Sequence, residues 1–158
     1  MDLLIIFGAK YLFIVIGILA IIKILFSPKD LKVSYIKLAI FTLPLSLIIA
    51  KIGNLIIFSP RPFVVERITP LIHASADNGF PSDHTLLSLT IASIVFAYNK
   101  KTGAILLLFG LLVGVSRVLA HAHHWVDVIG SLFIAVIATY ISSYLVKKIK
   151  YKLPYLES

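Results

Sequence analysis

Five long apolar runs constrain this 158-residue sequence more than any other feature. They lie at residues 3–26, 36–58, 82–98, 104–120 and 126–146. A helix needs about 20 residues to cross the hydrocarbon core of a membrane, and these runs have that length or are slightly shorter. None of them alternates polar and apolar residues as the strands of a membrane barrel do. We therefore expect an all-α integral membrane bundle of about five transmembrane helices.

The composition agrees with a membrane protein and excludes several functions. The chain is 59% hydrophobic and 14% charged, whereas a soluble domain is about half apolar and a quarter charged. The formal net charge is +8, but the basic residues form no single patch, so we expect no nucleic-acid binding. The chain has no cysteine, which excludes disulfides, thiolate metal sites and cysteine catalysis.

Nothing in the sequence divides the chain. It contains no internal repeat, low-complexity tract or linker, so a single domain over residues 1–158 is expected. The first run is too long for a signal peptide, contains Lys10 and precedes no small-residue cleavage site. We interpret it as a retained first span.

The lysines predict the orientation in a plasma membrane. They cluster after the first, third and fifth runs, at Lys29, Lys32, Lys100, Lys101, Lys147, Lys148, Lys150 and Lys152. These three segments lie on one side by parity, and cytoplasmic segments carry the excess of lysine and arginine. The N-terminus and the connectors 59–81 and 121–125 are therefore expected outside, and the C-terminus in the cytoplasm.

The outer connectors and the helix ends beside them concentrate polar residues that orientation does not explain. All three arginines fall there, at Arg61, Arg67 and Arg117, together with histidines, a serine and a carboxylate. Arginine forks bind phosphate oxygens in pairs. One histidine can attack phosphorus, and a second can protonate the leaving oxygen. These residue types indicate phosphoryl transfer by a protein nucleophile, at a site on one membrane interface.

Three motifs carry a resemblance to a known family. In chain order they are Arg61-Pro62, Pro81-Ser82-Asp83-His84 and Ser116-Arg117, the last followed by His123 and Asp127. In this order and spacing they resemble the signature of the type 2 phosphatidic-acid phosphatase superfamily. Residues 58–85 are most similar to its bacitracin-resistance branch, which hydrolyses undecaprenyl diphosphate. The resemblance covers about residues 51–130.

The resemblance implies a role for each matching residue. His123 would be the nucleophile, and Asp127 would hold its tautomer and stabilise the imidazolium, as an aspartate does in a catalytic triad. His84 would be the general acid for the leaving oxygen. The phosphoryl oxygens would be bound by Arg61, Arg117 and Ser82. This chemistry needs no metal and no other cofactor.

The chain departs from the family pattern in two places. The lysine that usually lies seven residues before the first-motif arginine is replaced by Asn54. Lys51 lies three residues earlier, about 4.5 Å back along a helix. Lys51 either takes the place of the missing lysine at the phosphate or snorkels elsewhere, and both positions are candidate phosphate-binding residues. The family usually has six spans, so with five counted here an N-terminal element is expected to be absent.

Several neighbouring polar residues have more than one interpretation. His73 and Asp77 either help to bind a diphosphate or gate the site, or are solvated loop residues. Asp83 caps the third helix, pairs with an arginine, or is protonated in the complex.

The histidines of the 121–125 connector could suggest a metal site. Zinc needs three or four convergent donors, and no glutamate is placed nearby as in zinc peptidases, so we expect none. His121 and His124 are interpreted as interfacial or supporting residues. If the spacing from Ser116-Arg117 were disregarded, His124 would compete with His123 as the nucleophile.

The resemblance thus implies hydrolysis of a polyprenyl diphosphate, undecaprenyl or dolichol-type, to the monophosphate and inorganic phosphate through a phosphohistidine. The alternative within this class is a phosphatase for phosphatidate, phosphatidylglycerol phosphate or another lipid monophosphate. An anion or lipid transporter is the alternative from another class. The expected partners are the lipid substrate and membrane lipids, and the oligomeric state is left open.

Overall fold

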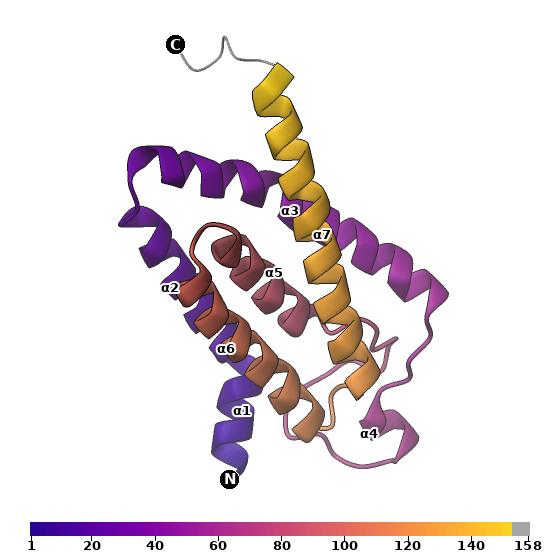
Figure 1. The fold of residues 1–158 in the computed structure, drawn as a ribbon. Helices are drawn as coiled ribbons and strands as arrows, with labels where there is room; N and C mark the ends of the chain where they lie inside the picture. Colours follow the sequence, from indigo (N-terminus) through magenta and orange to yellow (C-terminus); the bar gives the residue numbers. More distant parts are fainter. Residues whose placement is uncertain (153–158) are drawn as a thin grey trace.

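The computed structural model describes residues 1–152, with side chains up to residue 148, and this part of the chain is helical (Figure 1). The helices are α1 (Asp2–Lys10), α2 (Leu12–Leu25), α3 (Lys29–Ile56), α4 (Pro62–Val65), α5 (Asp83–Tyr98), α6 (Lys100–Leu119) and α7 (Trp125–Lys152). Residues 1–152 form no strand, and an isolated bridge joins Pro60 to Asn78. The all-α prediction is confirmed. The side chains of Lys150 and Lys152, used above for orientation, lie outside the described residues.

Fewer helices than the predicted five have the length and composition of a membrane span. Among the described residues, α3, α6 and α7 are each long and apolar enough to cross a membrane. α1 and α2 are long and apolar enough only together, as a pair bent by 50°. The predicted run 3–26 is therefore two helices that meet at Tyr11. α5 has 16 residues, fewer than the roughly 20 that a span needs. Length and composition thus support three spans, or four if the bent pair is one.

The short helix α5 lies at the centre of the bundle. It contacts α2, α3, α6 and α7, and its residues take part in clusters with each of these helices. One cluster joins α2, α5 and α6 through Ile16, Ala20, Ala92, Val95, Leu106 and Val113. Because its neighbours shield α5 from lipid, it does not need the length of a lipid-facing helix.

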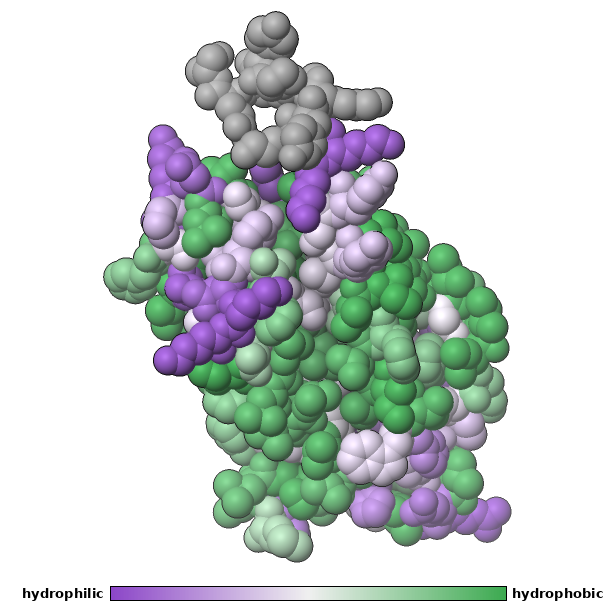
Figure 2. Space-filling model, viewed as in Figure 1, coloured by the Kyte–Doolittle hydropathy of each residue, from purple (hydrophilic) through white to green (hydrophobic). Residues whose placement is uncertain are grey.

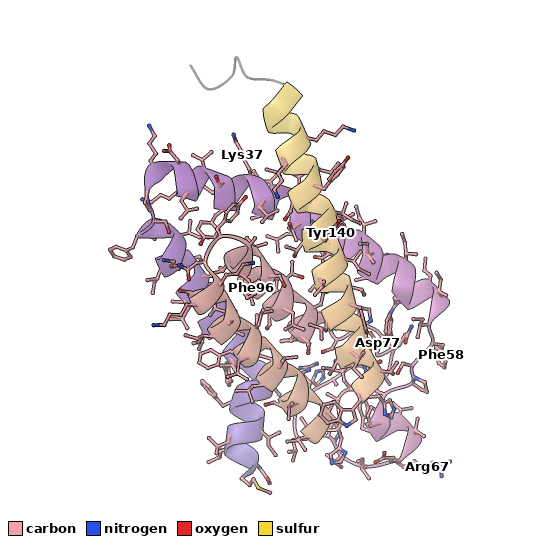
Figure 3. All side chains as sticks on the ribbon, viewed as in Figure 1. Lys37, Phe58, Arg67, Asp77, Phe96 and Tyr140 are labelled. Atoms are coloured by element: carbon pink, nitrogen blue, oxygen red, sulfur yellow. The ribbon has the colours of Figure 1, made fainter. Side chains whose placement is uncertain are left out.

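The two ends of the bundle differ in what they carry. Both connectors that hold the motif residues, between α3 and α5 and between α6 and α7, lie at one end, and the α2–α3 and α5–α6 turns lie toward the other (Figure 1). Apolar surface occupies the middle of the molecule, with hydrophilic residues toward the ends (Figure 2). Lys37 lies toward one end of the molecule, and Arg67 lies at the other (Figure 3). The two connectors that carry the motifs thus lie together, as predicted; which end faces the cytoplasm stays a prediction.

Phe80 anchors the long α3–α5 connector to the bundle. Its ring is 5% exposed and packs among residues of α3, α5 and α7. Gly53 and Gly130 provide the space, because a Cβ at either position would overlap the ring. The side-chain amide of Asn54 donates to the Phe80 carbonyl at 2.6 Å, and that of Asn78 donates to the Asn54 carbonyl at 2.8 Å. These contacts fix the connector where it enters the polar end of the bundle.

Candidate active site

The ring of His123 lies at the centre of the polar end and is 2% exposed. Its Nδ1 is 3.0 Å from the carbonyl oxygen of Gly79 and 3.3 Å from Oδ2 of Asp127. Both oxygens are acceptors, so Nδ1 carries the proton. Its Nε2 is 3.1 Å from NH1 of Arg61 and 3.2 Å from NH2 of Arg117, and guanidinium groups only donate. Nε2 therefore carries no proton, and its lone pair is directed between two cations.

A left-handed turn after α6 brings His123 to this position. The amide of Ala122 donates to the Arg117 carbonyl at 3.1 Å, and that of His121 donates to the Val118 carbonyl at 2.9 Å. This pair of bonds is a Schellman motif, which requires a left-handed residue after the helix. His121 supplies it with a φ of 57°. The side chain of His121 is exposed, and its interpretation as an interfacial or supporting residue stays a prediction.

Asp127 lies in the first turn of α7 and is fully buried. The expected contact with His123 is present, although His123 precedes the helix instead of lying within it. Oδ2 also accepts a hydrogen bond from the amide of His124 at 2.9 Å. This second bond holds the carboxylate in place against Nδ1 of His123.

Arg61 is buried at the start of α4, and its guanidinium is held on two sides. Nε and NH2 each lie 2.9 Å from Oδ1 of Asp77, whose side chain is 62% exposed. NH1 donates to the carbonyl of Ala122 at 3.1 Å. Residual burial raises the pKa of Asp77, but hydrogen bonds from Ser75 and Arg61 outweigh it and bring that pKa below its ordinary value. Asp77 therefore orients Arg61 as a charged carboxylate.

Arg117 is buried in the last turn of α6. Its NH1 donates to the carbonyl of Ala9 in α1 at 3.4 Å. Its Nε has no hydrogen-bond partner among the described residues. A buried donor without an acceptor costs about 1–3 kcal/mol, so an anion bound here would gain from supplying one.

The start of α5 brings the second motif to the same end. Ser82 is the fully buried N-cap residue, and its Oγ lies 2.9 Å from Oγ1 of Thr85. Its amide donates to the carbonyl of Asp127 at 3.4 Å, which joins the second motif to the third. Asp83 is exposed in the first turn, where the helix dipole favours a carboxylate.

His84 follows within the same turn and is half-buried. It interacts electrostatically with Arg117 and His123. Its ring packs edge-to-face on that of Phe13 in α2, with centroids 4.7 Å apart and planes at 82°. The two histidines of the predicted set therefore lie on the same side of the bundle.

The remaining predicted residues lie outside these contacts. Nε2 of His124 is 3.0 Å from the carbonyl of Pro60, so the arginines approach the ring of His123 and not that of His124. Lys51 is exposed on α3, and His73 is exposed in the α3–α5 connector. The side-chain amide of Asn54 donates a hydrogen bond to the Phe80 carbonyl. Phosphate contacts for Lys51, His73 and Asn54 stay predictions. Within residues 1–152, no three His, Asp or Glu side chains converge as a metal ion would require.

The surroundings of His123 also set its charge. Burial lowers its pKa below the ordinary value of 6.5, and the positive charges of Arg117 and Arg61 lower it further. The hydrogen bond with Asp127 opposes this shift without cancelling it. A lowered pKa means that the ring is neutral at pH 7, so its Nε2 electron pair is available.

The sequence did not single out Gly79, whose carbonyl orients the ring of His123. A Cβ at this position would lie 3.0 Å from Oδ2 of Asp127 and 3.1 Å from the carbonyl oxygen of Ser59. Such distances are closer than ordinary contacts, so a side chain would disturb the carboxylate. The Asn78-Gly79 dipeptide, a common turn signal, was the clue available in the sequence.

A cavity of about 280 Å³ adjoins the ring of His123 between α4 and the facing ends of α6 and α7. It is lined by Pro62, Glu66, Val118, Leu119, His121, His123, His124 and Trp125. Its apolar lining from α6 and α7 includes Trp125, which is 54% exposed. The cavity thus connects a polar centre with an apolar outer surface.

Comparison with known proteins places this site in context. The family model of the PAP2 superfamily matches residues 35–151. The chain is 45% identical over 91 residues to the undecaprenyl-diphosphatase BcrC of Bacillus subtilis (strain 168), which is 58% of this chain and 47% of that protein. It is 34% identical over 92 residues to the bacitracin transport permease protein BcrC of Bacillus licheniformis, 58% of this chain and 45% of that protein.

A third relative matches over a longer stretch. The putative undecaprenyl-diphosphatase YbjG of Escherichia coli (strain K12) is 30% identical over 133 residues, 84% of this chain and 67% of that protein. The chain spans about half the length of the two BcrC relatives. No solved structure matches the chain.

Proposed function

The chain belongs to the PAP2 superfamily, and from this membership and the geometry at His123 we propose that it is a membrane phosphatase for a polyprenyl diphosphate. Two of the relatives above have undecaprenyl-diphosphatase in their names, one of them as putative. The observation that carries the proposal is the position of His123 Nε2, 3.1 Å and 3.2 Å from two guanidinium groups. A phosphoryl group bound by those cations has its phosphorus facing a nucleophilic electron pair.

In the first step, Nε2 of His123 attacks the terminal phosphorus of the diphosphate. A P–N bond forms, and the bond from phosphorus to the bridging oxygen breaks. The negative charge of the bound diphosphate favours the protonated form of His84, which gives its proton to that oxygen, so the lipid monophosphate leaves. Asp127 stabilises the imidazolium that forms on His123, and Arg61 and Arg117 stabilise the charge on the phosphoryl oxygens.

In the second step, water attacks the phosphorus of the phosphohistidine. The now neutral His84 accepts a proton from the water, the P–N bond breaks, and inorganic phosphate leaves. His123 recovers its free Nε2 pair and His84 its proton, so the protein returns to its starting state. These residues complete the reaction without a metal ion, which is part of the proposal.

Two features support a lipid phosphate as the substrate. The unpaired Nε of Arg117 is a buried donor beside the reacting atom, and a phosphoryl oxygen would supply its acceptor. The cavity beside His123 has apolar lining from Val118, Leu119 and Trp125. We propose that the lipid chain passes over these residues toward the bilayer, between α6 and α7.

Transport is the competing function, and the name of one relative includes it. Carrier sites usually lie near the bilayer midplane. The arginines and histidines of this protein gather instead at one end of the bundle, in two connectors and the helix ends beside them. This placement favours chemistry at an interface.

Phosphate release by the detergent-solubilised protein tests the proposal, with a prenyl diphosphate compared with phosphatidate and with EDTA added. We expect faster release from the diphosphate, no loss with EDTA, and a fall of at least about a thousandfold in His123→Ala and Arg117→Ala. His124→Ala, the matched control, should keep most of the activity.

Each alternative outcome has a distinct meaning. Unchanged activity in His123→Ala would reject the nucleophile. Loss of activity with EDTA would reject the metal-free reaction. Faster release from phosphatidate would replace the proposed substrate by a lipid monophosphate.

A further inference from the structure

The N-terminal helix pair lies outside residues 35–151, where the family model matches, yet it reaches the candidate active site. α1 packs closely on α6 at Gly8, which has no side chain. A Cβ at this position would overlap the side chain of Ser116. The next residue, Ala9, is fully buried, and its carbonyl accepts the hydrogen bond from Arg117. Figure 1 shows α1 and α2 running beside α6 toward the polar end.

The break at Tyr11 makes the Ala9 carbonyl available. In an unbroken helix this carbonyl would accept from the amide of Phe13, four residues later. Within residues 1–152, no such bond joins α1 to α2 at this point, and the amide of Ile14 donates to Tyr11 instead. Phe13, at the start of α2, remains on the side that faces α5, where it meets the ring of His84.

His84 is held differently from His123. The ring nitrogens of His123 face two acceptors and two donors. In the described part of the chain, neither ring nitrogen of His84 makes a hydrogen bond, and its ring contact is the edge-to-face pair with Phe13 at 4.7 Å. Aromatic pairs of this geometry are favourable and directional. The direction of the His84 ring therefore depends on packing and not on hydrogen bonding.

We propose that Phe13 is a positioning residue for His84, which holds the imidazole in the direction from which it protonates the leaving oxygen. The proposal rests on the proposed function, because His84 is the general acid there. An acid must lie within hydrogen-bond reach of the oxygen that it protonates. Without the ring of Phe13, the His84 side chain can turn to other rotamers, and the fraction of protein with the acid in place falls.

A comparison of leaving groups separates this role from general support of the fold. Phosphatidate releases a strongly basic alkoxide, whose departure depends on a proton, whereas p-nitrophenyl phosphate releases a weakly basic phenolate that departs without one. Phe13→Leu keeps apolar bulk and removes the ring. We measure kcat/KM, because it covers the reaction up to departure of the leaving group and excludes the second step, in which His84 is the base for either substrate. We expect kcat/KM to fall on the order of tenfold with phosphatidate and less than about twofold with p-nitrophenyl phosphate.

Three further variants complete the experiment. Phe13→Tyr keeps the ring and should restore kcat/KM with phosphatidate to near the wild-type value. Ile14→Ala changes the next residue of α2, which is 46% exposed, and should leave kcat/KM unchanged with both substrates. His84→Ala should show the same dependence on leaving group as Phe13→Leu, but more strongly.

The outcomes separate this proposal from the proposed function. Equal losses with both substrates in Phe13→Leu, or no loss with either, would overturn the positioning role if His84→Ala still depends on the leaving group. If His84→Ala lowers kcat/KM equally for both substrates, the acid role of His84 itself fails, and the role of Phe13 fails with it.

Discussion

The environment of His123 specifies one tautomer and one charge state. Two acceptors face Nδ1 and two cations face Nε2, so the electron pair points toward the place where an anion would bind. Burial and the two arginines both lower the pKa of the ring. The same cations that would bind a phosphate therefore also favour the unprotonated ring of His123.

This charge state predicts how activity depends on pH. A histidine with its ordinary pKa of 6.5 would lose its nucleophilic form as the pH falls through that value. Because the pKa of His123 is lowered, the acid limb of kcat/KM, which reports the free enzyme, should lie below pH 6.5. The substrate phosphate also ionises with pH, and the profile must be corrected for this ionisation, which phosphorus NMR measures. An acid limb above pH 6.5 after that correction would show that the ring is protonated in the free protein.

At the residue scale, side-chain chemistry was predictable and backbone chemistry was not. The family resemblance implied the contact between Asp127 and His123, which the structure contains. The carbonyls of Gly79 and Ala9 also hold the site together, but every residue has a carbonyl, so no residue type marks them. The contact of Phe13 with His84 was equally unpredictable, because an aromatic residue in an apolar run is typical of an ordinary core position.

Among the helices, α3 and α7 depend on small residues at the place where Phe80 enters. The ring lies where a Cβ at Gly53 or Gly130 would be. It therefore holds the α3–α5 connector, and with it Gly79, against both helices. The position of the His123 ring thus depends on the packing of Phe80, the residue next to Gly79.

Gly130→Ala tests this dependence. The added methyl group would overlap the Phe80 ring, and overpacking of this kind costs about 1–3 kcal/mol. The melting temperature in detergent should fall, and activity should fall with it because the connector is displaced. Gly17→Ala in α2 is the matched control, since a Cβ there meets nothing within 4 Å, and its stability should be unchanged or higher by up to about 1 kcal/mol. Equal melting temperatures for the two variants would contradict the role given to Phe80.

The hydrophobic pattern predicted where the long helices lie, but it did not predict the break at Tyr11 or the short length of α5. The apolar runs located every long helix, because burial in lipid requires such runs. The break at Tyr11 has no proline or glycine at the bend, so the run 3–26 read as continuous. The length of α5 depends on its neighbours, which a single sequence does not specify.

For the whole molecule, the parity of the connectors brings the three motifs to one end. The lysines predict that this end is extracytoplasmic. An extracytoplasmic site suits an enzyme that acts on a lipid carrier after export. This orientation is the part of the proposal that depends on the membrane and not on the fold.

Single cysteines test the orientation directly, because the chain has none of its own. Ala76 is exposed in the α3–α5 connector, and Lys101 is exposed at the start of α6. In intact cells, a membrane-impermeant maleimide should label Ala76→Cys, and it should label Lys101→Cys only after permeabilisation. The reverse labelling pattern would place the site in the cytoplasm.

The central claim is that phosphorus becomes bonded to Nε2 of His123, and trapping of this species tests it most directly. The protein is mixed with a prenyl diphosphate radiolabelled on its terminal phosphate and quenched in alkali, where phosphohistidine survives. The account predicts labelled protein that loses its label in acid, persists in His124→Ala and is absent in His123→Ala. Label that remains in His123→Ala, or phosphate release by the wild-type protein with no labelled species at any time, would contradict it.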